Sequence, residues 1–105
     1  MGRGKSVDPN SKTDVILTSA RYAAEGDHLI MAQGYQRVGF VWSDLLLFDR
    51  NQLLGFLRMG KQIATGHSNE TPGDFTVLAR IVEANGMLAI EGSSGLRDDL
   101  GLPLF

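Results

Sequence analysis

Aromatic and arginine side chains on segments with the apolar–polar alternation of β-strands are the residues of this chain best suited to binding a ligand. The candidates for such a surface are Arg21, Tyr35, Arg37, Trp42 and Arg80. Aromatic rings stack on bases and arginine adds charge, so a sheet face carrying both can hold single-stranded nucleic acid. The formal net charge of −2 opposes this function, because nucleic-acid binders usually carry a basic patch or stripe.

Two short motifs have the spacing of known sites but lack what the chemistry needs. Gly55, Gly60 and Lys61 are spaced like a phosphate-binding loop, yet Gln62 stands where Ser or Thr would hold Mg²⁺. We interpret Gly60 as a helix stop instead. Residues 1–6 match the pattern for N-myristoylation. Because so few positions define that pattern, chance explains the match.

Neither a metal site nor a catalytic centre is predicted, and we expect no cofactor. The chain has no cysteine, which excludes disulfides and thiol nucleophiles. His67, Glu70 and Asp74 share a polar run, but no helical spacing fixes them as metal ligands. The carboxylates are scattered, without a spaced pair on an apolar background for acid–base work.

The elements that must position these residues are mostly strands. Alternating apolar and polar residues predict strands over 14–23, 28–33, 36–42, 75–84 and 87–91. Asn85-Gly86 joins the last two as a hairpin, because both central residues of a type I′ turn need positive φ. Gly34 is expected to separate the second predicted strand, 28–33, from the third, 36–42. Within the third, Val38, Phe40 and Trp42 are expected on one face and Arg37 on the other.

One helix is predicted between the strands. Asp49 followed by Gln52 resembles a capping box, and Gly60 follows the last apolar position, so the helix covers Arg50 to Met59. Residues 45–48 fit either the sheet or a longer helix, and we favour the sheet. A run of polar and turn-forming residues predicts a loop over residues 63–74. The helix's apolar arc spans about 220°, whereas packing on one sheet needs about 100°. The surplus must face the C-terminal segment, a second subunit or a partner.

These elements predict an α+β fold. It is an antiparallel sheet of four to five strands, in two hairpins, with one helix packed on a face, in the order β-β-β-α-β-β. Residues 1–12 are expected to form a flexible tail, 13–92 a single domain, and 93–105 a segment that docks or binds a partner. No apolar run reaches the ~18 residues of a membrane span, and no secretory signal is evident. We expect a cytoplasmic protein without membrane contact.

The leading hypothesis is a small non-enzymatic binding or assembly module that self-associates, most simply as a two-fold homodimer. A different protein partner would use the same surface. That surface would combine apolar residues of the helix and the C-terminal segment: Leu54, Phe56, Met59, Leu100, Leu102, Leu104 and Phe105. The alternative is a single-stranded nucleic-acid binder using the aromatic and arginine face. A third hypothesis is an enzyme acting on a small ligand at a subunit boundary.

Overall fold

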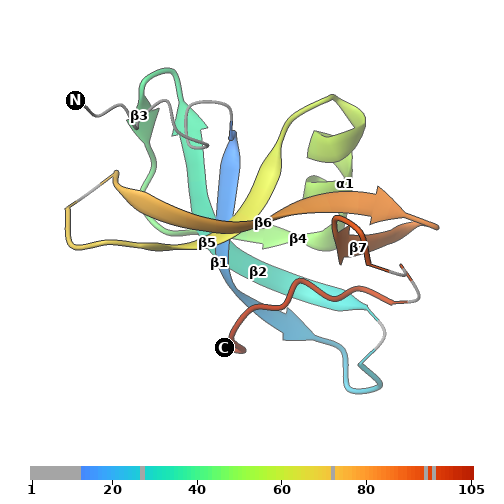
Figure 1. Cartoon of the computed structure of the whole chain (residues 1–105). Helices are drawn as coiled ribbons and strands as arrows, with labels where there is room; N and C mark the ends of the chain where they lie inside the picture. Colours follow the sequence, from blue (N-terminus) through green and yellow to red (C-terminus); the bar gives the residue numbers. More distant parts are fainter. Residues whose placement is uncertain (1–12, 27, 72, 94, 96) are drawn as a thin grey trace.

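A computed structural model of the chain describes residues 13–26, 28–71, 73–93, 95 and 97–105 (Figure 1). The predicted N-terminal tail, residues 1–12, lies outside these described residues. The elements in chain order are β1 (Val15–Tyr22), β2 (Leu29–Val38), β3 (Val41–Trp42), β4 (Leu46–Asp49), α1 (Arg50–Arg58), β5 (Ile63–Ser68), β6 (Phe75–Ala84) and β7 (Met87–Ile90).

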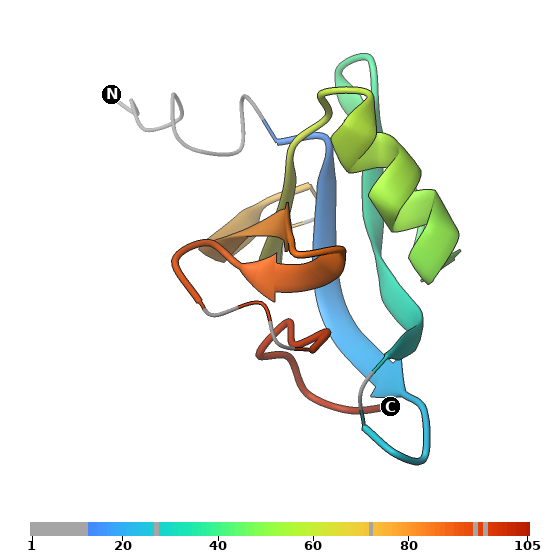
Figure 2. The same cartoon turned by 90° about the vertical axis from the view of Figure 1, so that its right-hand side faces the viewer.

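A mixed sheet makes up most of the structure, and it curls into a half-barrel (Figures 1 and 2). Its strand order is β3-β2-β1-β5-β6-β7, with β4 also paired to β2. β1 and β5 run parallel, and the other neighbours run antiparallel. The prediction of a sheet with one helix is confirmed, but a sheet of four to five antiparallel strands is wrong. The connection from β4 through α1 to β5 is a helical crossover, which produces parallel strands.

The segment predicted as a loop, residues 63–74, begins with strand β5. Ile63, Ala64 and Thr65 are buried, and they pair with β1 on one side and β6 on the other. The irregular, polar part begins only after Ser68. A short central strand that is covered on both sides lacks the alternation by which strands are recognised in a sequence. Tertiary pairing therefore decides this element.

Strand β2 continues through Gly34, where a break was expected. A Cβ at position 34 would collide with the backbone carbonyl oxygen of Ile16 on β1, so glycine allows the two strands to approach closely. The chain reverses instead at Gly39, whose φ is +66°. As a result Arg37 pairs directly with Trp42, and directly paired residues share a face. The prediction that they occupy opposite faces is wrong.

Helix α1 begins with the predicted capping box. The Asp49 side chain accepts a hydrogen bond from the Gln52 backbone N–H at 2.8 Å, and the Gln52 side chain accepts one from the Asp49 N–H at 2.9 Å. Gly60, with a φ of +86°, follows the C-cap residue Met59. Residues 46–49 belong to the sheet as β4, as favoured from the sequence.

The hydrophobic core lies between α1 and the sheet. α1 contributes Leu53 and Leu54, which are buried, and Phe56 and Leu57 pack against the core from its edge. Met59 stays 67% exposed. Most of the wide apolar arc is therefore covered within the chain.

Residues 97–105 form a strap along the open side of the curled sheet, from β7 to the end of β1 (Figure 2). The Asp99 N–H donates to the Leu88 carbonyl at 2.9 Å, and the Ala20 N–H donates to the Pro103 carbonyl at 2.9 Å. Leu100 is fully buried between these contacts. The strap thus docks on its own chain, where it covers one side of the core.

Candidate aromatic pocket

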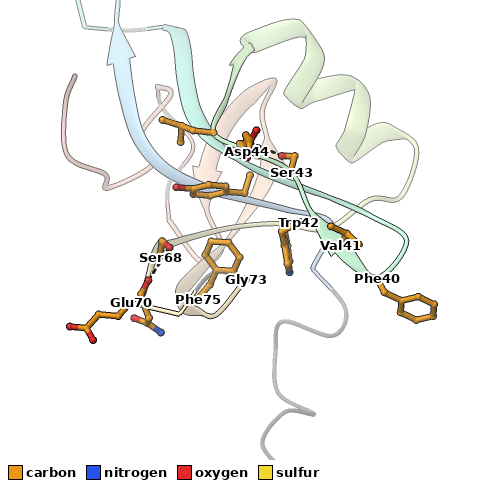
Figure 3. A pocket seen from close by; sticks show the side chains of 12 residues that line it. Phe40, Val41, Trp42, Ser43, Asp44, Ser68, Glu70, Gly73 and Phe75 are labelled. Carbon is orange, nitrogen blue, oxygen red and sulfur yellow. Dashed lines mark hydrogen bonds between the residues drawn. The ribbon is translucent and has the colours of Figure 1, made fainter.

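A cavity of about 760 Å³ opens where the β2–β3 hairpin meets the loop between β5 and β6 (Figure 3). Three aromatic rings form its centre. The ring centroids of Tyr35 and Phe75 are 5.1 Å apart, and those of Trp42 and Phe75 are 4.9 Å apart. Phe75 is only 6% exposed, so the cluster is anchored in the body of the protein.

The curl of the sheet explains why these rings meet. Tyr35 projects from β2 opposite Ile16 of β1, whereas Phe75 begins β6, which is separated from β2 by β1 and β5. β5 lies between β1 and β6, and a Cβ at its Gly66 would collide with the Thr76 carbonyl oxygen on β6, so glycine lets these two strands pair closely. Sequence reasoning placed Phe75 on a strand but missed its role, because no local signal tells which distant strand it faces.

Polar side chains around the cavity hold its walls in place. The Ser43 hydroxyl accepts a hydrogen bond from the Gln36 N–H at 3.0 Å and donates to the Asp44 carbonyl at 2.8 Å. In the opposite wall, the Asn69 side chain donates to the Asp74 carboxylate at 3.3 Å and accepts from the Thr76 hydroxyl at 3.2 Å. Both walls are thereby braced before any ligand arrives.

Asp44 and Glu70 are the charged residues that line the cavity. Both are exposed. Among the described residues, neither carboxylate has a hydrogen bond or ion pair. Glu70 extends outward from the rim (Figure 3). The mouth of the cavity therefore carries negative charge that no side chain in the described residues neutralises.

Arg37 lies beside this cluster. Its guanidinium carbon is 5.4 Å from the centroid of the Trp42 ring, a cation–π distance. Its Nη2 donates to the Thr13 carbonyl at 2.7 Å, and its Nε donates to the same oxygen at 3.2 Å. Arg37 is thus held by the backbone just before β1.

Apolar side chains flank the cavity on the hairpin side. Phe40 is fully exposed at the tip of the β2–β3 hairpin, and Val41 and Leu45, which also line the cavity, are exposed as well. Figure 3 shows Phe40 pointing away from the cavity, whereas Trp42 and Phe75 turn toward each other. We call Phe40, Val41 and Leu45 the apolar rim.

The structure gathers only part of the nucleic-acid face expected from the sequence. Tyr35, Arg37 and Trp42 lie together, as described above. Arg21 lies on β1, where its guanidinium carbon is 4.7 Å from the Phe105 ring centroid and its Nε donates to the Phe105 carbonyl at 3.0 Å. Arg80 is exposed on β6. Neither arginine lines the aromatic cavity.

The residues expected to form an oligomer surface are also dispersed. Leu54 and Leu100 are buried in the core, and Phe56 and Leu102 pack against it. Met59 and Leu104 are exposed, but one follows α1 and the other lies on the strap beside β1. Much of this apolar surface is therefore used inside the chain.

A buried ion pair joins the strap to the rest of the protein. Asp98 is 1% exposed, and its Oδ2 lies 2.6 Å from Arg50 Nε. The same carboxylate accepts hydrogen bonds from the backbone N–H groups of Leu29 at 2.6 Å and Leu88 at 2.9 Å. Burial by itself would raise the pKa of Asp98, but the bonds from Arg50, Leu29 and Leu88 together lower it below its ordinary value. Asp98 therefore stays ionised as a structural clasp.

Within the part of the chain that the structure describes, no cluster of three or more histidine or carboxylate side chains is arranged to hold a metal ion. In the same residues, no helix has the length and apolar character needed to cross a membrane. A scan against protein-family models found no match, and comparisons with curated proteins and with solved structures found none either.

Proposed function

We propose that this protein is a small non-enzymatic binding module, and that its ligand binds in the aromatic pocket. The observation that carries the proposal is the assembly of three rings from three separate strands in one open cavity. Its volume of about 760 Å³ falls in the range of about 300–1,000 Å³ typical of ligand sites. A pocket that is already braced loses less entropy when it binds.

The polar groups of the pocket favour binding over catalysis. Acid–base catalysis usually depends on a carboxylate whose pKa burial or a close charge has shifted. Asp44 and Glu70 are exposed to solvent, and Ser43 and Asn69 are engaged in bracing the walls. The buried carboxylate of Asp98 is fully paired.

Self-association stays part of the proposal, but through the apolar rim instead of the apolar residues of the helix and the C-terminal segment. Leu54 and Leu100 serve the core, whereas the apolar rim is open to solvent. A second copy of the chain is therefore one candidate occupant of the rim and pocket. Light scattering over a range of protein concentrations would detect it.

Nuclear magnetic resonance on the full chain tests the proposal. We expect amide shifts of Tyr35, Trp42, Gly73 and Phe75 to change with at least one probe from a panel of indole, hexa-arginine, hexa-glutamate and an oligothymidylate. Substituting Trp42→Leu should weaken that binding about tenfold or more, because stacking on one ring contributes about 1–3 kcal/mol. Met59→Ala, which changes an exposed apolar side chain outside the pocket, is the matched control. Shifts that avoid the pocket with every probe would contradict the proposal.

A further inference from the structure

We infer that the aromatic pocket recognises a guanidinium or ammonium group carried by a basic peptide segment of a protein partner. This inference rests on the proposed function, because it names the ligand of the same pocket. It draws on three features: the charge around the cavity, the chemistry of its rings, and the apolar rim beside it.

The charge around the cavity is negative. Asp44 and Glu70 line it, and Asp74 lies in the same loop as Glu70, bonded to Asn69. Arg37 is the cation packed against the ring cluster. Of the residues that the structure describes here, three carboxylates and one guanidinium give a formal charge of −2. Such a field attracts a cationic group and repels phosphate.

The rings suit a cation for a second reason. The negative faces of aromatic rings attract guanidinium and ammonium groups, most strongly at tryptophan. Arg37 already makes this contact with Trp42 from the protein side, at 5.4 Å from the ring centroid. The indole therefore accepts a guanidinium in this environment. Tyr35 extends the aromatic surface within the cavity, and the buried Phe75 ring supports both Tyr35 and Trp42 from behind.

The apolar rim favours a peptide over a free organic cation. Phe40, Val41 and Leu45 expose apolar surface next to the cavity, and the residues flanking a basic side chain in a peptide could cover it. Nucleic acid is disfavoured, because Arg21 and Arg80 lie outside this cavity and Arg37 is held by the Thr13 carbonyl.

Trp42 is the single tryptophan of the chain, so its fluorescence reports on this pocket alone. We expect saturable changes with capped hexa-arginine, weaker ones with hexa-lysine, and none with hexa-glutamate or an oligothymidylate. The variant carrying both Asp44→Asn and Glu70→Gln should bind hexa-arginine about fivefold more weakly, and added salt should weaken binding to the natural chain. Glu25→Gln is the control, because Glu25 is exposed in the β1–β2 connection, at the opposite end of β2 from Trp42.

Two results would overturn the inference. One is hexa-arginine leaving Trp42 fluorescence unchanged, and the other is hexa-arginine binding equally well to the double variant. Asp44 and Glu70 are exposed, and each replacement amide has nearly the same shape as the carboxylate it replaces. An unchanged thermal midpoint would show that the variant is folded. If the oligothymidylate or hexa-glutamate changes the fluorescence instead, the pocket is still a binding site but its ligand is not cationic. If indole and all charged probes leave the pocket unperturbed, the proposed function fails as well.

Discussion

At the scale of single residues, Asp98 connects more of the fold than any sequence pattern indicated. It lies beside Arg97 and Asp99 in a short charged run, which is typical of a solvated surface. In the structure its carboxylate is buried and accepts hydrogen bonds from β2, β7 and the first residue of α1. Removing one partner of a buried pair is costly, because it leaves the other groups without compensation.

The stability of the protein should therefore depend on the ionisation of Asp98. Its folded-state pKa lies below the ordinary value, so its contribution is complete above about pH 4 and is lost as the pH falls through the folded pKa. We expect Asp98→Asn to lower the free energy of unfolding by about 3 kcal/mol at pH 7, with a smaller difference at pH 3. Urea denaturation at both values measures this. Glu91→Gln, at an exposed position, is the control, and an equal loss in both variants would contradict the assignment.

At the scale of elements, two glycines show how the same residue type acts differently in a strand and in a helix. Gly34 lies where β2 presses against the backbone of β1, whereas nothing lies within 4 Å of the position that a Cβ would take at Gly55 in α1. Glycine is required at the first site by close approach. At the second it only adds freedom to the unfolded chain.

Alanine substitutions at these two glycines should change stability in opposite directions. Gly34→Ala should destabilise the protein by about 2 kcal/mol or more, because the two central strands must move apart. Gly55→Ala should stabilise it by about 0.5–1 kcal/mol, the usual advantage of alanine inside a helix. Chemical denaturation of the two variants side by side measures both effects. Equal effects of one sign would mean that β1 and β2 are not packed as described.

At the scale of the whole molecule, the strap covers the side of the curled sheet that no strand or helix of the described residues covers. The curled sheet exposes the second half of β1 and the edge of β7, and residues 97–105 bridge them. Leu100 fills the core, and its N–H donates to the Tyr22 hydroxyl at 3.0 Å. A tyrosine hydroxyl is neutral at physiological pH, and burial raises the pKa of Tyr22 further. The segment is thus part of the monomer's fold.

A strap that stabilises its own chain and a strap that joins two chains predict different results. If the strap serves the monomer, Leu100→Ala should cost about 2–5 kcal/mol, and a chain ending at Gly95 should lose its cooperative thermal transition. Leu104→Ala, which changes a side chain that is 72% exposed, should have little effect. Calorimetry combined with light scattering measures both. A shortened chain that stays folded and only dissociates from dimer to monomer would instead make the strap an assembly element.

The sequence by itself determined the features that depend on neighbouring residues. The Asp49–Gln52 capping box, the end of α1 near Gly60 and the Asn85-Gly86 hairpin all act over a few positions, so their residue types suffice. Only the tertiary structure decided the parallel pairing of β5 with β1, the meeting of Tyr35 and Trp42 with Phe75, and the docking of the strap. These contacts join distant segments, and their geometry depends on the crossover of α1 and the curl of the whole sheet, which no local pattern encodes.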